Sequence, residues 1–217
     1  MNTAIILAAG KSSRMDSDTP KQYLKINKKL VIDYSIDAFQ DCDIIDDIII
    51  VVGKEYIDKV KDLYPKLNII QGGASRKESS FLGLKACSPL TKNVIIHDAA
   101  RIFINKSLIL NCINILLNAD GATIATLMTD TLARFKNNFI TNMEEREKLI
   151  SIQTPQAFNY KKILLAHEKF SGEATDDIRI MLESGYNCQF IISDNQNFKL
   201  TTKSDYENSI KILGENR

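Results

Sequence analysis

Residues 3–15 read TAIILAAGKSSRM, an apolar run that passes directly into small and polar residues. The run Thr3–Ala8 is typical of a strand that is buried on both faces of a parallel sheet. Similar runs recur along the chain and alternate with segments of helical pattern, which predicts a doubly wound α/β fold with a mainly parallel sheet. The further predicted strands are Asp47–Val52, Leu67–Gln71, Asn93–His97, Ala122–Leu127 and Cys188–Ile192. The predicted helices are Leu30–Phe39, Glu55–Leu63, Ser79–Ala86, Lys106–Leu117, Lys161–Glu168, Asp176–Ser184 and Ser204–Leu213.

The segment 129–152 breaks this alternation. Two strand-like pieces flank the polar turn Lys136–Asn138, and the charged stretch Asn142–Lys148 follows. We expect a protruding β-hairpin arm within a single domain that spans residues 1–217. An exposed arm needs a partner surface, which favours a homodimer; a solvated excursion on a monomer is the alternative.

Composition narrows the class of protein. The 217 residues are 44% hydrophobic and 25% charged, which is typical of a globular chain. A net charge of +1 argues against a nucleic-acid partner. No apolar run approaches the roughly 20 residues of a membrane span, and Met1–Ala9 lacks the pattern of a signal peptide. The four cysteines are widely separated, which is typical of reduced thiols, so we expect a cytoplasmic protein.

The loop after the first strand, Ala8–Met15, has the composition of a phosphate-binding segment. It combines small residues with Lys11 and Arg14, and Lys21 follows closely. Backbone N–H groups and cations together suit a triphosphate. The loop fits neither the P-loop nor the GxGxxG pattern, and an ordinary turn with a solvated basic face is the alternative.

Two later loops carry further candidates. Gly72–Ser80 is rich in glycine, which permits close backbone approach to a ligand, and Ser79 or Ser80 is expected to cap the helix that follows. A simple capped turn would give the same pattern. In HDAAR, residues 97–101, Asp98 ends a strand where open α/β sheets bind ligands. Its carboxylate suits Mg²⁺, and Arg101 suits a phosphate. Helix capping is the alternative for Asp98, and His97 is expected to be a packed histidine.

The motifs occur in one fixed order: AAGKSSRM and PKQY, GGASRKESSFLGL, HDAAR, TDT (129–131), QTPQAF (153–158), TDD (175–177) and NFKLT (197–201). Together, from Ile5 to about Ile210, they resemble the 2-C-methyl-D-erythritol 4-phosphate cytidylyltransferase family of the non-mevalonate isoprenoid pathway. The resemblance implies a Rossmann-like nucleotidyltransferase fold. It also implies Mg²⁺-dependent transfer of CMP from CTP to that polyol phosphate, with release of pyrophosphate.

The resemblance assigns roles to individual positions. The implied catalytic residues are Arg14, Lys21, Asp98 and Lys199, with Asp98 also the Mg²⁺ ligand. The implied CTP-binding residues are Ala8, Ala9, Gly10, Gly72, Gly73, Arg76 and Ser79. The implied acceptor-binding residues are Arg101, Thr131 and Arg146, the last two of which can come from the arm of a partner subunit.

Three positions depart from the family pattern: Asp16 stands where glycine is usual, Ile102 where proline is usual, and Ala133 where a basic residue is common. They keep ribitol 5-phosphate, or another polyol phosphate, as an alternative acceptor. A dinucleotide-binding oxidoreductase is disfavoured because it needs a GxGxxG turn. The alternative that is not an enzyme is a non-catalytic nucleotide-binding module. The presence of all the charged residues that the family uses argues against it. Without the resemblance, the residues do not determine which base the nucleotide substrate carries.

Overall fold

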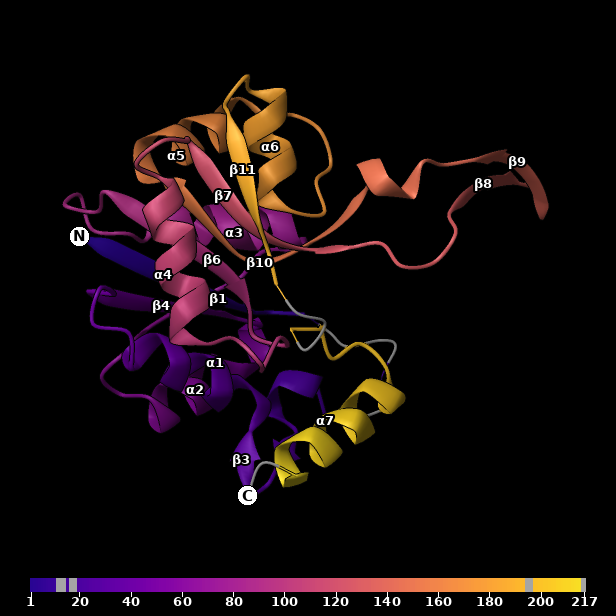
Figure 1. The fold of residues 1–217 in the computed structure, drawn as a ribbon. Helices are drawn as coiled ribbons and strands as arrows, with labels where there is room; N and C mark the ends of the chain where they lie inside the picture. Colours follow the sequence, from indigo (N-terminus) through magenta and orange to yellow (C-terminus); the bar gives the residue numbers. More distant parts are fainter. Residues whose placement is uncertain (11–14, 16–18, 194–196, 216–217) are drawn as a thin grey trace.

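The computed structural model describes residues 1–10, 15, 19–193 and 197–215, and its centre is a seven-stranded sheet (Figure 1). The strand order is β11-β7-β10-β6-β1-β4-β5, and β10 is antiparallel to its neighbours while the other pairs are parallel. The predicted doubly wound fold is confirmed. The strands are β1 (Asn2–Ala8), β4 (Asp47–Val52), β5 (Asn68–Gln71), β6 (Asn93–Asp98), β7 (Gly121–Leu127), β10 (Ile150–Asn159) and β11 (Cys188–Ile192).

Helices cover both faces of the sheet because successive strand residues point to opposite sides. On β1, Ile6 packs into a core with α1, α2 and α4, whereas its neighbour Ile5 packs into a second core with α3, α5 and α6. Both isoleucines are fully buried, each stabilising the fold by about 2 kcal/mol. The helices are α1 (Val31–Gln40), α2 (Ile57–Leu63), α3 (Arg76–Lys85), α4 (Lys106–Ile115), α5 (Tyr160–Lys169) and α6 (Asp177–Glu183).

The chain direction places a crevice between β1 and β6. These strands are parallel neighbours, and Leu7 pairs with Asp98 at their carboxyl ends. After β1 the chain continues to β4, toward one edge of the sheet, and after β6 it continues to β7, toward the opposite edge. The two following loops therefore separate, and open α/β sheets bind ligands at such a switch point.

Strand β10 is absent from the sequence prediction. It holds the motif QTPQAF and lies in the middle of the sheet between β6 and β7, with an irregularity between Ile152 and Gln156. Its polar residues and proline hide the apolar pattern of a strand, although Ala157 and Phe158 are fully buried.

The start of α3 also corrects the prediction. The helix begins at Arg76, and its cap is Ser75, whose Oγ accepts a hydrogen bond of 3.1 Å from the Glu78 backbone N–H. Ser79 and Ser80 therefore lie inside the helix and are not caps, because the helix already starts three residues before Ser79.

The segment after β7 forms a hairpin that extends away from the sheet (Figure 1). Its strands are β8 (Ala133–Lys136) and β9 (Phe139–Met143), joined at Asn137 and Asn138, which both adopt positive φ. The 3₁₀ helix η3 (Arg146–Lys148) leads back toward β10. Large apolar side chains on the hairpin are exposed to solvent: Phe135, Phe139, Ile140 and Met143.

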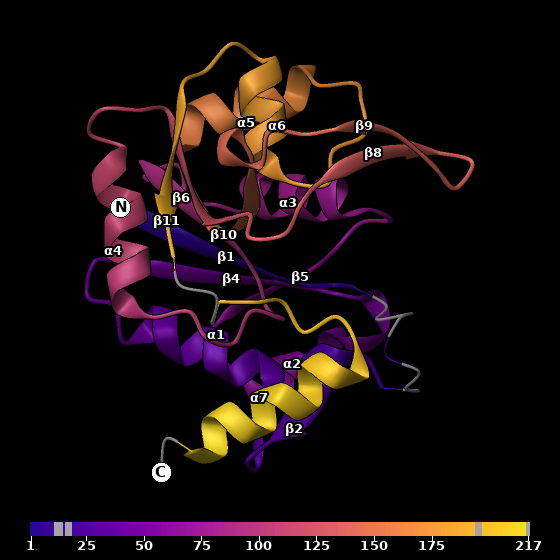
Figure 2. The same cartoon turned by 45° about the vertical axis from the view of Figure 1, so that its right-hand side comes forward.

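The carboxyl-terminal helix α7 (Lys203–Glu215) lies beside a small hairpin of β2 (Lys25–Ile26) and β3 (Lys29–Leu30), as Figure 2 shows. The Tyr206 hydroxyl donates a hydrogen bond of 2.6 Å to the Lys25 carbonyl. Two 3₁₀ helices, η1 (Lys21–Tyr23) and η2 (Lys54–Tyr56), complete the elements. Across the described ranges, no helix has the length and apolar character needed to cross a membrane.

Candidate active site

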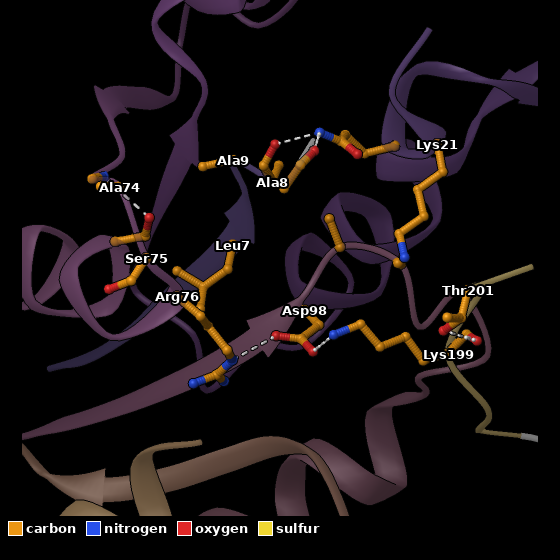
Figure 3. A pocket seen from close by; sticks show the side chains of 16 residues that line it. Leu7, Ala8, Ala9, Lys21, Ala74, Ser75, Arg76, Asp98, Lys199 and Thr201 are labelled. Carbon is orange, nitrogen blue, oxygen red and sulfur yellow. Dashed lines mark hydrogen bonds and ion pairs between the residues drawn. The ribbon is translucent and has the colours of Figure 1, made fainter. Parts of the chain in front are cut away.

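A cavity of about 500 Å³ opens at the carboxyl ends of β1 and β6 (Figure 3). Its size suits a nucleotide, since small-molecule sites usually occupy about 300–1,000 Å³. Three cationic side chains, Lys21, Arg76 and Lys199, and one carboxylate, Asp98, line it among the described residues, so the lining favours an anionic ligand. The sequence-predicted residues on its wall are Ala8, Ala9, Gly10, Lys21, Gly73, Arg76, Ser79, Asp98 and Lys199.

Gln22 fixes the start of the first loop. It is buried in η1, and its side-chain amide donates hydrogen bonds to the carbonyls of Ala8, at 2.6 Å, and Gly10, at 3.0 Å. These two carbonyls thereby face the amide of Gln22. Arg14 and Lys11 lie outside the described residues.

The glycines of the second loop allow it to approach the first loop closely. A Cβ on Gly72 would lie 2.6 Å from the Ala9 Cβ and 2.9 Å from the Ser79 Oγ, so no larger residue fits without movement. The Gly73 N–H donates to Ser79 Oγ at 3.1 Å, and the Ala74 N–H donates to Glu78 Oε2 at 2.7 Å. Helix α3 thus holds the loop that precedes it through its own first turn.

Asp98 lies between two cations at the floor of the cavity (Figure 3). Arg76 Nε donates to its Oδ1 at 3.2 Å, and Lys199 Nζ donates to its Oδ2 at 2.6 Å. The Leu200 N–H donates to the Ala100 carbonyl at 2.8 Å, which brings the segment of Lys199 against the end of β6.

The charge state of Asp98 follows from these contacts. Burial acts to raise the pKa of the carboxyl, but the charges of Arg76, Lys199 and Arg101 and the Lys199 hydrogen bond together outweigh burial. The pKa therefore lies well below its usual value, and Asp98 is ionised at neutral pH. An ionised carboxylate oxygen is a ligand type that suits Mg²⁺.

His97 does not line the cavity and is a packed histidine, as the sequence predicts. It is fully buried, its Nδ1 lies 3.2 Å from Thr154 Oγ1, and its Nε2 lies 3.1 Å from the Arg101 carbonyl. Burial lowers its pKa from 6.5 to about 4, although Asp98 opposes this shift. His97 is therefore a neutral packing residue at pH 7.

The motif order and this geometry agree with comparisons to known proteins. A family model described as 2-C-methyl-D-erythritol 4-phosphate cytidylyltransferase matches residues 2–215. The chain belongs to this family. It is 35% identical over 224 residues to the protein of that name from Clostridium botulinum (strain 657 / Type Ba4), with 99% of this chain and 96% of the other covered.

Further members of the cytidylyltransferase family extend the agreement. The chain is 35% identical over 219 residues to the protein of the same name from Thermosipho africanus, covering 94% of this chain and 95% of the other. The crystal structure of 4-diphosphocytidyl-2C-methyl-D-erythritol synthase from Anaerococcus prevotii matches with a TM-score of 0.87 and 29% identity, covering 98% of both chains. The chain is therefore a cytidylyltransferase of this family in sequence and in fold.

Several residues implied by the cytidylyltransferase family lie away from the cavity. Gly72 lies behind its wall, next to Ala9. The Arg101 side chain is directed to the Asn197 carbonyl, to which Nη1 donates at 2.9 Å. Thr131 and Arg146 are exposed at the base of the hairpin, where Arg146 Nη1 donates to the Thr129 carbonyl at 2.6 Å. Neither of these two residues is among those that line the cavity of the single chain.

The structure also adds residues to which the sequence gives no role. Gln22 supports the first loop, and Asp177 pairs with Arg76 through a 2.7 Å contact between Arg76 Nη1 and Asp177 Oδ2. Both lie in motifs shared with the family, PKQY and TDD. Their motif membership is the only signal in the sequence, because their partners are distant along the chain.

Proposed function

We propose that this chain transfers CMP from CTP to 2-C-methyl-D-erythritol 4-phosphate, giving 4-diphosphocytidyl-2-C-methyl-D-erythritol and pyrophosphate. The observation that carries the proposal is the ionised Asp98, held between Arg76 and Lys199 at the floor of a cationic cavity. The cavity lies at the switch point of a chain that belongs to the family named for this reaction.

The reaction needs positioning and charge neutralisation more than a nucleophilic side chain. An oxygen of the acceptor phosphate forms a bond to the α-phosphorus of CTP, while the bond to the pyrophosphate oxygen breaks. The phosphate monoester is already an anionic nucleophile, so bringing two polyanions together is the main obstacle. In the proposal, Arg14, Lys21 and Lys199 neutralise the phosphates, and the backbone at Ala8, Ala9 and Gly10 faces the triphosphate.

The base is proposed to bind at the second loop. Gly73, Arg76 and Ser79, which line the cavity, would contact cytosine or ribose there, and Gly72 would let the loop pack against Ala9 behind them. The approach of Gly72 to Ala9 supports this placement, because it joins the two loops into one wall of the cavity.

Mg²⁺ fits the donor set as a metal held mainly by phosphates and water. The described residues contain no group of three or more His, Cys, Asp or Glu side chains that would hold a metal alone. Mg²⁺ is commonly bound through one or two carboxylates together with substrate phosphates, and Asp98 supplies one ionised carboxylate. When bound, the metal neutralises charge on the phosphate oxygens.

The acceptor is proposed to bind between two copies of the chain. Thr131 and Arg146 lie beside the hairpin and outside the cavity lining of their own chain, so a partner subunit is the source that would bring them to the acceptor phosphate. Arg101 would complete that site. The exposed Phe135, Phe139 and Ile140 support a homodimer, since large exposed apolar patches mark interaction surfaces.

The dimer is tested by size-exclusion chromatography with light scattering on Phe135→Ser/Phe139→Ser. We expect the wild type to have the mass of two chains and the double variant that of one, with turnover lost at dilute concentration. An unchanged mass would contradict the proposed interface.

We place the enzyme in the cytoplasm because its four cysteines are free thiols, and reducing compartments keep thiols in this state.

Pyrophosphate release tests the proposed reaction. The purified protein is mixed with Mg²⁺, one of CTP, UTP or ATP, and either methylerythritol 4-phosphate or ribitol 5-phosphate. Release only with CTP and methylerythritol 4-phosphate is the expected result. Release only with ribitol 5-phosphate would replace the acceptor and keep the phosphate-site assignments. No release with any pair would favour a non-catalytic nucleotide-binding module.

A further inference from the structure

Asp177 is a buried carboxylate outside the cavity. It stands in the first turn of α6 with no exposed surface, and both of its oxygens are used. Ser80 Oγ donates to Oδ1 at 2.7 Å, and His167 Nε2 lies 2.9 Å from the same oxygen. The Asp177 backbone N–H donates to the Gln156 side chain at 3.1 Å, so α3, α5 and β10 all fix its position.

Arg76 connects this buried carboxylate to the cavity. Its Nη1 donates to Asp177 Oδ2 at 2.7 Å, and its Nε donates to Asp98 Oδ1 at 3.2 Å. The contact to Asp177 is the shorter one, and Asp177 is the more deeply buried of the two carboxylates. One guanidinium is therefore shared between a fixed internal anion and the proposed metal ligand.

We propose that Asp177 is a positioning residue for Asp98, acting through Arg76. The fixed carboxylate holds the Arg76 guanidinium so that only Nε reaches Asp98. It also supplies a second negative charge for the cation. Asp98 thereby keeps its orientation and remains able to face a metal ion and phosphates. This inference rests on the proposed function for its kinetic tests, but its geometric test is independent of it.

Neutralising Asp177 would redistribute the Arg76 charge. In the Asp177→Asn variant, Asp98 is the only anion left beside the guanidinium among the described contacts. A side-on pair with two N–H donors to Asp98 then becomes the favoured arrangement, because bidentate pairs are stronger than single contacts. Arg76 would compete with Mg²⁺ for the same carboxylate.

The test compares Asp177→Asn with Asp176→Asn. The control removes a neighbouring charge and retains a good helix cap, since asparagine caps as well as aspartate. For Asp177→Asn we expect half-saturating Mg²⁺ to rise about tenfold, with the KM for CTP within about threefold of wild type. The control should match the wild type in both. A purely structural role would lower the amount of active protein without moving the Mg²⁺ requirement.

A double-variant comparison identifies the route. If Asp177 acts only through Arg76, adding Asp177→Asn to Arg76→Met leaves turnover and the Mg²⁺ requirement as they are in Arg76→Met. Ser80→Ala, which removes one hydrogen bond to Asp177, replaces Asp177→Asn in the kinetic test if that variant does not fold. We expect it to raise half-saturating Mg²⁺ about threefold. Independent, multiplicative effects of the two substitutions would overturn the proposal.

Crystal structures of the wild type and Asp177→Asn provide a readout without turnover. The expected difference is a guanidinium that has moved onto Asp98 with two N–H contacts. An Arg76 in its original place, together with an unchanged Mg²⁺ requirement, would overturn the proposal. If the wild type turns over no substrate pair, the proposed function fails, and the crystallographic comparison alone then decides the role of Asp177.

Discussion

Replacing the buried His97 by glutamine should remove a specific part of the protein's acid sensitivity. His97 lies directly before Asp98 at the end of β6, packs edge-on against Phe39 at 5.5 Å between ring centroids, and is fully buried. Glutamine can also bond Thr154 and the Arg101 carbonyl, but it does not take up a proton. The variant therefore isolates protonation from packing.

The magnitude follows from the shifted pKa. Burial lowers the His97 pKa from 6.5 to about 4, so below pH 6.5 the unfolded chain binds a proton that the folded chain does not. Stability is therefore present above that pH and is lost as the pH falls toward 4. Between pH 7 and pH 5 the loss amounts to about 2 kcal/mol, with each pKa unit worth about 1.4 kcal/mol.

Urea unfolding at pH 7 and pH 5 measures this loss. The wild type should lose about 2 kcal/mol more of its unfolding free energy than His97→Gln over this interval. Asp98 and Asp177 have lowered pKa values and contribute mainly below this range. The second histidine, His167, is present in both proteins, so its effect cancels in the comparison. Equal losses in the two proteins would refute a buried neutral His97.

Three further substitutions test the cavity wall and the loop packing behind it. Gly72→Ala should destabilise the fold by about 1–3 kcal/mol in urea unfolding, because the new Cβ meets Ala9 and Ser79. The matched control is Gly214→Ala, whose Cβ meets nothing within 4 Å among the described residues and which should cost no stability. Lys199→Met should lower kcat about 100-fold with an unchanged circular dichroism spectrum, because it removes the ammonium beside Asp98 Oδ2. Gln22→Leu should raise the KM for CTP and lower the unfolding free energy by about 2 kcal/mol, because two loop carbonyls lose its amide; unchanged values would contradict its supporting role.

The fold was predictable where the local pattern is strong. Runs such as Asp47–Val52 are apolar throughout because both sheet faces are covered, and alternation with helices then determines the fold class. Strand β10 was not predictable in this way. Its pairing with β6 and β7 depends on distant residues, and its Gln, Thr and Pro residues resemble a loop.

The site was predictable in its loops and less so in its charges. The loops after β1 and β6 both border the cavity because parallel strands end at one edge of a sheet. The pairing of Arg76 with Asp98 and Asp177, 22 and 101 residues away, was beyond local pattern. From the sequence, Arg76 was assigned only a contact to the nucleotide. The position of Thr131 and Arg146 outside the cavity lining likewise follows from how the hairpin extends away from the sheet.

The transfer of the α-phosphate itself gives the most direct test of the proposed function. The protein is incubated with Mg²⁺, methylerythritol 4-phosphate and CTP that is radiolabelled at the α-phosphate, and the products are separated. We predict that the label enters a cytidine diphospho-polyol in one-to-one ratio with released pyrophosphate, and that Asp98→Ala abolishes both. Label that remains in CTP, or that appears as free CMP without a polyol product, would contradict the proposed cytidylyl transfer.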